Sequence, residues 1–174
     1  MDDKITVPEL VTTKLTAVEI SHIADNGDIF CHLQPCAVDY VKTLITEFIR
    51  KVSNNPSEKA PISFQESLFV IQDSDTNKLY RAELINKTDD GRCNMYFIDY
   101  GYSKLIPSSK MYPIKLQYME DEIYKYPPQA IRTKLIGVSN LAIESLVIRL
   151  RSHFSMRRKA YVSTLSIPTT MILM

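Results

Sequence analysis

Short alternating segments separated by turn-forming residues fill the middle of this chain and constrain its fold more than any other feature. Polar turns at 73–77 and 88–91 interrupt the pattern, Gly101 breaks a third segment and Pro107 stops a fourth. The candidate strands are 68–72, 79–85, 93–100 and 104–106. Strands this short, at this spacing, predict a small β-barrel over residues 62–116.

A hairpin and a helix are expected before this barrel. Residues 14–34 contain an Asn-Gly pair between two alternating apolar runs, and both residues tolerate the positive φ angles of a tight turn. From Val41 to Phe48 the apolar side chains recur at i, i+3, i+4 and i+7, the spacing of one helix face. We therefore predict two strands over 14–34 and a helix over 35–56.

After the barrel, the pattern indicates a strand, a helix and another strand. Residues 130–138 and 159–167 read as strands, and apolar positions from 143 to 154 recover helical spacing. The complete order predicts a mainly β fold with helices, of the α+β class, in which a small barrel is inserted within a mixed frame.

Composition and charge exclude several classes of protein. The formal net charge is +1, from 21 Lys and Arg against 20 Asp and Glu, whereas a domain that binds nucleic acid through charge typically has a pI above about 9. No apolar run approaches the roughly 20 residues that span a bilayer, and the N-terminus has no apolar signal segment. Three scattered cysteines predict a reducing, intracellular compartment.

The sequence also offers little for catalysis. Cys31 and Cys36 belong to no Cys/His set with zinc spacing, and the three histidines are dispersed, so we expect the cysteines to be small buried hydrophobes. We find no cluster of carboxylates for Ca²⁺, no Gly-rich phosphate loop and no Ser/His/Asp or Cys/His arrangement. We therefore expect no metal, no cofactor and no enzymatic activity.

Three short motifs carry a resemblance to a known family. They are Tyr-Arg-Ala at 80–82, Phe-Ile-Asp-Tyr-Gly at 97–101 and Tyr-Pro-Pro-Gln-Ala at 126–130. Together they resemble the extended Tudor domain of proteins in the germline PIWI–piRNA pathway. In that family a Tudor barrel is inserted into a staphylococcal-nuclease-like half of OB type.

The resemblance implies a division of the chain. It assigns 10–34 and 128–174 to the nuclease-like half, 35–56 to a linker helix, 62–116 to the Tudor barrel and 117–127 to a connecting segment. Because we find no carboxylate cluster in the nuclease-like half, we expect it to be a scaffold without catalytic activity.

The resemblance also implies a binding site for arginine. In the family, aromatic side chains and one Asn form a cage for a methylated arginine, whose flat, weakly hydrated guanidinium is attracted to aromatic faces. By resemblance this chain supplies Tyr80, Phe97 and Tyr100. Tyr102 stands where the family has the Asn, and Asp73 where it has its first aromatic. Since a carboxylate can accept hydrogen bonds from an unmodified guanidinium, the site is expected to take unmethylated arginine as well.

Other readings of the same residues stay open. The aromatic residues of the motifs could be barrel core rather than walls of a site. Arg81 and Asp99 are expected to form a structural ion pair between neighbouring strands. A basic run contains no acid and reads either as a solvated helix face or as a contact for phosphate or an acidic partner. Its members are Arg149, Arg151, Arg157, Arg158 and Lys159.

The resemblance implies a non-catalytic adaptor. Its expected partner is the Arg/Gly-rich N-terminal tail of a PIWI-family Argonaute, in perinuclear germ granules (nuage) of the cytoplasm. Two alternatives remain. The first is a scaffold with a defunct cage that binds another protein, or dimerises, through a different surface. The second is single-stranded RNA binding by the OB-type half, which would show a steep salt dependence.

Overall fold

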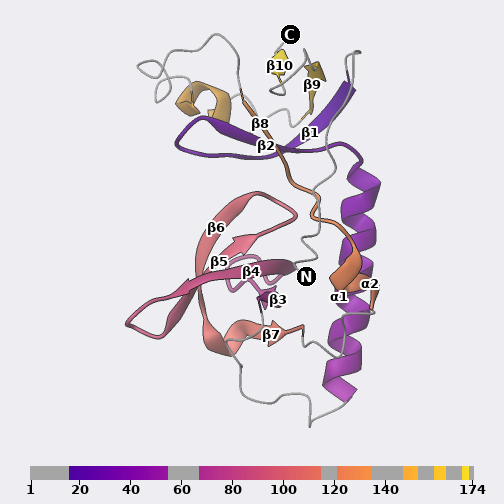
Figure 1. Ribbon diagram of the computed structural model, residues 1–174, viewed down its shortest axis with the longest axis vertical. Coiled ribbons are helices and arrows are strands. Elements are labelled where there is room, and N and C mark those ends of the chain that lie inside the picture. Colours follow the sequence, from indigo (N-terminus) through magenta and orange to yellow (C-terminus); the bar gives the residue numbers. More distant parts are fainter. Residues whose placement is uncertain are drawn as a thin grey trace, which may run out of the picture. The chain divides into compact units, whose positions relative to one another are not determined.

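The chain divides into two compact units, each with its own sheet (Figure 1). One unit comprises 1–35 and 128–174, and the other comprises 36–127. The expected mainly β, α+β class is confirmed. The computed structural model describes residues 16–54, 67–114, 121–134, 147–152, 159–163 and 170–172.

The first unit is a five-stranded closed barrel with strand order β1-β2-β8-β10-β9. All neighbours are antiparallel except β10 and β8, which are parallel. Residues 147–152 are helical. The strands are β1 (Thr16–Ile23), β2 (Asp28–His32), β8 (Ile131–Lys134), β9 (Lys159–Ser163) and β10 (Thr170–Ile172).

The predicted hairpin is confirmed, since β1 and β2 pair around Gly27, whose φ is 82°. Alternate side chains from β1 and β2 fill the barrel core together with Ile131, Val147 and Leu150. The predicted later elements are confirmed over β8, the helical residues 147–152 and β9. The remainder of each lies outside the described residues. That this unit is a nuclease-like half stays a prediction.

The second unit contains a five-stranded antiparallel sheet with order β6-β5-β4-β3-β7. A short 3₁₀ helix, η2 (Ser108–Lys110), joins β6 to β7. The strands are β3 (Leu68–Gln72), β4 (Leu79–Lys87), β5 (Arg92–Phe97), β6 (Tyr102–Pro107) and β7 (Met111–Pro113).

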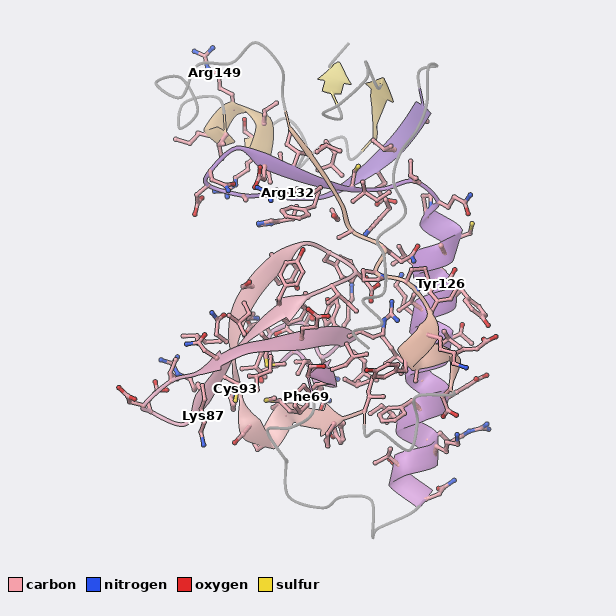
Figure 2. The ribbon with its side chains drawn as sticks, in the orientation of Figure 1. Phe69, Lys87, Cys93, Tyr126, Arg132 and Arg149 are labelled. Carbon is pink, nitrogen blue, oxygen red and sulfur yellow. The ribbon has the colours of Figure 1, made fainter. Side chains whose placement is uncertain are left out.

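The two faces of this sheet bury different side chains. One face forms a core that includes Phe69, Cys93 and Phe97, all with 0% exposure (Figure 2). The other face, with Leu68 and Val70, packs against the helices α1 (Pro35–Asn54) and α2 (Glu122–Lys125).

Helix α1 has the periodic apolar stripe that the sequence predicts. Its buried residues are Val38, Val41, Leu44, Ile45, Phe48 and Val52. Full burial of each large apolar side chain contributes about 1.5–3 kcal/mol, so this stripe is the main attachment of the helix. The helix ends at Asn54, and the last two predicted positions lie outside the described residues.

The third predicted strand is shorter than expected. We predict 93–100, but β5 ends at Phe97 and 98–101 form a turn. The N–H groups of Tyr100 and Gly101 both donate to the Phe97 carbonyl, at 3.0 and 2.8 Å. Gly101 closes the turn with a φ of 84°, which a residue without Cβ adopts easily. Ile98 is buried, so the apolar pattern continues into the turn and hides it.

The cysteines differ in exposure. Cys31 and Cys93 are buried, but Cys36 at the start of α1 is exposed, which corrects the expectation that all three are buried. Within the described ranges, no group of three or more His, Cys, Asp or Glu side chains could hold a metal ion. No helix among those ranges is long and apolar enough to cross a membrane.

Candidate functional site

Four aromatic side chains of the second unit pack into one aromatic cluster, formed by Tyr80, Phe97, Tyr100 and Tyr102. Tyr80 meets Phe97 and Tyr100 edge to face, with ring centroids 5.3 and 5.2 Å apart. Tyr102 stacks on Phe97 at 4.6 Å and lies 6.4 Å from Tyr100. Edge-to-face and offset-stacked pairs contribute about 0.5–1.5 kcal/mol each beyond their buried area, so the cluster is well ordered.

Backbone structure explains why these residues meet. Phe97 ends β5 and Tyr102 begins β6, and the two residues are directly paired across the antiparallel strands. Tyr100 lies in the turn between them, and Tyr80 lies on the neighbouring strand β4. The tight 98–101 turn therefore brings three rings together within six positions of the sequence.

The members of the cluster differ in accessibility. Phe97 is fully buried, whereas Tyr80, Tyr100 and Tyr102 are partly buried. In this conformation Phe97 supports the cluster from beneath, and the accessible aromatic surface comes from the three tyrosines. Burial is the largest cause that raises the pKa of the Tyr102 phenol, followed by the nearby Tyr80 and Asp73, so the phenol stays neutral at physiological pH.

Asp73 lies beside this cluster but is not a free acceptor. Its carboxylate accepts hydrogen bonds from Lys104 Nζ at 2.6 Å, from the Asp75 N–H at 3.2 Å and from Thr76 Oγ1 at 3.0 Å. Burial alone raises the pKa of the Asp73 carboxyl, but the hydrogen bonds from Lys104, Asp75 and Thr76 hold it below its usual range. The carboxylate is therefore charged, and both of its oxygens are engaged.

Lys104, which the sequence analysis did not single out, supplies the balancing charge. Its ammonium also donates to Asp75 Oδ2 at 2.6 Å. Hydrogen bonds from Asp73 first, and Asp75 second, raise the pKa of Lys104. The alternation of β6 places its side chain on the same face as Tyr102, which is the one signal in the sequence that could have found it.

Arg81 and Asp99 form a fully buried ion pair. Arg81 Nε and Nη2 donate to the two carboxylate oxygens of Asp99 at 3.0 and 2.7 Å. The same guanidinium donates to the carbonyls of Ile123, Tyr126 and Pro127 at 2.9, 2.6 and 3.1 Å. These five bonds match the five N–H donors of an arginine. Asp99 lies in the 98–101 turn rather than on a strand, so the pair anchors the turn that carries Tyr100.

The basic run does not gather into one site among the described residues. Arg151 donates to the Ile23 carbonyl at 2.6 and 3.0 Å and to Asp25 at 2.8 Å, so it joins the helical residues to the β1–β2 turn. Arg149 is exposed and extends from the helical segment (Figure 2). The remaining members lie outside the side chains that the structure describes: Arg157, Arg158 and Lys159.

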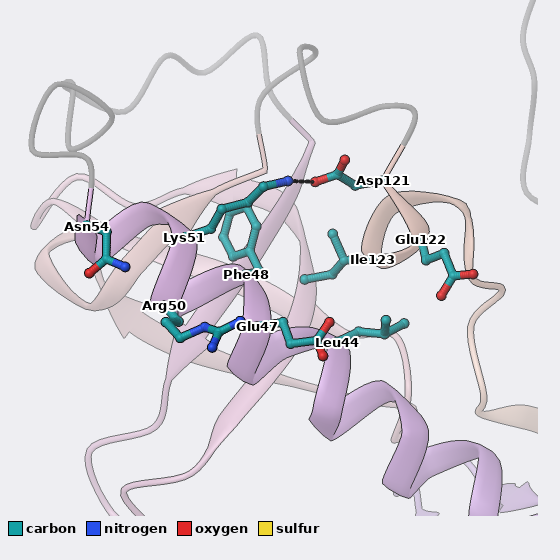
Figure 3. Close-up of a pocket in the computed structure, with 9 residues that line it drawn as sticks. All are labelled: Leu44, Glu47, Phe48, Arg50, Lys51, Asn54, Asp121, Glu122 and Ile123. Atoms are coloured by element: carbon teal, nitrogen blue, oxygen red, sulfur yellow. Dashed lines mark hydrogen bonds and ion pairs between the residues drawn. The ribbon is translucent and has the colours of Figure 1, made fainter.

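A separate hollow lies between α1 and α2, with a volume of about 650 Å³ (Figure 3). Leu44, Phe48 and Ile123 supply its apolar lining. Lys51 on α1 and Asp121, just before α2, form an ion pair at 2.7 Å (Figure 3). None of the residues that the sequence analysis selected for binding lines this hollow.

A sheet of five short antiparallel strands with an aromatic cluster at one turn defines a small β module of Tudor type. The Tudor domain family model matches residues 10–137, and the chain belongs to this family. No curated protein matches the sequence.

Solved structures with the same fold are extended Tudor domains. The third such domain of mouse TDRD1, in complex with a MILI peptide containing dimethylarginine, has a TM-score of 0.70 and 17% identity. That match covers 98% of this chain and 86% of that one. The human TDRD1 domain, in complex with a symmetrically dimethylated peptide, has a TM-score of 0.73 and 18% identity over 97% and 84%.

A variant of the Drosophila melanogaster Papi domain gives a third similar structure. Its complex with a Piwi N-terminal peptide that carries a dimethylated arginine has a TM-score of 0.69 and 16% identity, over 88% of this chain and 77% of that one. The same variant has also been solved with the unmethylated Piwi peptide. At these identities the likeness shows the fold alone.

Proposed function

We propose that this protein is a non-catalytic adaptor that binds an arginine-containing segment of a partner protein on the accessible faces of Tyr80, Tyr100 and Tyr102. The carrying observation is the aromatic cluster itself. Three partly buried tyrosines meet within hydrogen-bonded backbone, over a fully buried Phe97. Such a surface attracts a guanidinium by cation–π contact, at about 0.5–2 kcal/mol per ring depending on desolvation.

The partner we propose is the Arg/Gly-rich N-terminal tail of a PIWI-family Argonaute. Support comes from the ligands of three structures of the same fold, which are MILI and Piwi peptides with a dimethylated arginine and a Piwi peptide without the modification. A non-catalytic role is supported by the family, because Tudor domains are binding modules. With such a partner, the protein would act in perinuclear germ granules of the cytoplasm.

The affinity is expected to be modest. A single disordered segment loses conformational entropy when it is ordered, so a Kd on the order of micromolar, about −8 kcal/mol, is expected. Tight recruitment would then depend on several arginines in the tail or on several modules acting together.

Calorimetric titration with a PIWI-tail peptide tests this function. The peptide is used in unmethylated and symmetrically dimethylated forms against the wild type, Tyr100→Ala and Tyr112→Ala. Tyr112 is a matched control, because it is a partly buried tyrosine that packs on the other face of the same sheet. We expect at least one peptide form to bind the wild type and the control, and Tyr100→Ala to lose about tenfold or more, which is ~1.4 kcal/mol.

Two results would contradict the proposal. The first is that neither peptide form binds the wild type, which favours a scaffold that uses a different surface. The second is that Tyr100→Ala binds as tightly as Tyr112→Ala, which moves the site away from the cluster. An RNA titration at two salt concentrations then decides whether single-stranded RNA is the ligand instead.

A further inference from the structure

An ammonium group already occupies the acidic corner beside the aromatic cluster. We use acidic corner for the carboxylates of Asp73 and Asp75, which follow β3. Lys104 lies two positions after Tyr102 on β6, so both side chains lie on the same face of the strand. Its Nζ donates to Asp73 Oδ1 and to Asp75 Oδ2, each at 2.6 Å. The corner is therefore held by a cation of the chain itself.

Thr76 joins the acidic corner to the aromatic cluster. Its hydroxyl donates to Asp73 Oδ2 at 3.0 Å and lies 3.4 Å from the Tyr80 hydroxyl. Asp73 and Lys104 also both act electrostatically on the Tyr102 phenol. A guanidinium on the tyrosine faces would therefore lie next to the acidic corner.

The state of Asp73 determines what that guanidinium would meet. The side chain is only 5% exposed, and one of its oxygens accepts from both Lys104 and the Asp75 N–H. An unmodified guanidinium brings five N–H donors that are well hydrated before binding. To pair with Asp73 it would have to displace Lys104, which is itself a charge-assisted donor and repels another cation. Methyl groups remove donors and add apolar area, so a methylated guanidinium needs that carboxylate less.

We propose that Lys104 is a specificity-determining residue of this site: by occupying the acidic corner it withholds the Asp73 and Asp75 carboxylates from an incoming guanidinium, so that the tyrosines select arginine by its methyl groups. Removal of Lys104 exposes the carboxylates and shifts the preference to unmodified arginine. This inference rests on the proposed function, because it concerns the same site.

The test is a set of Lys104 variants titrated with both forms of the PIWI-tail peptide. Lys104→Met keeps the length of the side chain and removes the charge, and Lys104→Arg is the control that keeps the charge. We expect Lys104→Met to bind the unmethylated peptide about tenfold more tightly than the wild type does, the size of one hydrogen bond to a charged group. Binding of the dimethylated peptide changes much less, and Lys104→Arg resembles the wild type.

A double variant shows where such a gain originates. In Asp73→Asn/Lys104→Met the buried carboxylate is absent, so the gain for the unmethylated peptide should disappear. If the gain persists there, Asp73 is not the released acceptor and the inference is wrong. Circular dichroism melts establish that each variant is folded. Should Lys104→Met not fold, Asp75→Asn, at a 75% exposed side chain, loosens Lys104 from one side. It should then shift the ratio of affinities toward the unmethylated peptide, and an unchanged ratio overturns the inference.

The outcomes separate this inference from the proposed function. If the wild type binds a peptide and Lys104→Met leaves the ratio of the two affinities unchanged, the function stands and the role of Lys104 is wrong. If the wild type binds neither peptide but Lys104→Met binds the unmethylated one, Lys104 blocks the site and the function of the wild type is wrong. If neither protein binds either peptide, both are wrong.

Discussion

The guanidinium of Arg81 and the carboxylate of Asp99 hold the 98–101 turn against β4 with two parallel hydrogen bonds, in a place where neither side chain is more than 2% exposed. Because three backbone carbonyls accept the other donors of Arg81, the pair also ties this turn to residues 123–127. The turn carries Tyr100 and closes between Phe97 and Tyr102. This ion pair is therefore the structural support of the aromatic cluster.

Loss of one partner of this pair should be severe. Asp99→Ala leaves a buried guanidinium without its carboxylate, and the expected loss in the free energy of unfolding is about 3–5 kcal/mol. Urea denaturation followed by circular dichroism measures it. Arg92→Ala breaks the exposed pair with Asp90 and serves as the control, for which a much smaller loss is expected. Equal losses in the two variants would contradict the structural role of the Arg81–Asp99 pair.

Phe97 should behave as core rather than as a contact residue. Phe97→Ala removes a fully buried ring and is expected to destabilise the second unit by about 3–5 kcal/mol. Tyr100→Phe keeps the ring and should change stability little. Denaturant unfolding of both variants provides the comparison. A folded Phe97→Ala protein of wild-type stability would show that the ring is not part of the core.

Asp73 should make stability depend on pH at the acid end. The hydrogen bonds lower its pKa in the folded state, so its contribution is fully present above the unfolded pKa, roughly 3.9, and is lost as the pH falls through the folded pKa. The comparison is the free energy of unfolding of the wild type and Asp73→Asn from pH 7 to pH 2. We expect the wild type to be more stable at neutral pH and the difference to shrink below about pH 4. A constant difference would contradict the charged state of Asp73.

The three thiols should react at different rates. Burial raises the pKa of Cys31 to about 12 and also raises the pKa of Cys93, whereas Cys36 is exposed. Since the thiolate is the reactive form, one thiol should react quickly with iodoacetamide in the native protein. Mass spectrometry of the labelled peptides should identify it as Cys36, with the other two labelled only after unfolding. Rapid labelling of Cys93 would place it outside the core.

The elements with local signals could be predicted from the sequence. An Asn-Gly pair between alternating residues predicts the β1–β2 hairpin, and the stripe from Val41 to Phe48 predicts α1. The end of β5 was missed because Ile98 is buried in the turn and Asp99 is held there by Arg81, a contact 18 residues away in sequence. Short elements that depend on such contacts were missed too: β10 (Thr170–Ile172) and α2 (Glu122–Lys125).

The site shows the same limit. The motif at 97–101 and the tyrosines around it indicate that aromatic side chains gather, and the cluster contains all four of the aromatics that the resemblance names. Sequence spacing could not predict that Phe97 has no exposed surface or that Lys104 holds Asp73. Both follow from the register of β5 with β6 and from a turn after β3, which a single sequence does not specify.

The most direct test of the central claim locates the bound peptide on the protein. Aromatic ¹H–¹³C spectra are recorded with tyrosine labelling while the dimethylated PIWI-tail peptide is added. If the aromatic cluster is the site, the resonances of Tyr80, Tyr100 and Tyr102 shift saturably, and those of Tyr40 and Tyr112 do not. Saturable binding that leaves the three cluster tyrosines unshifted would contradict the claim.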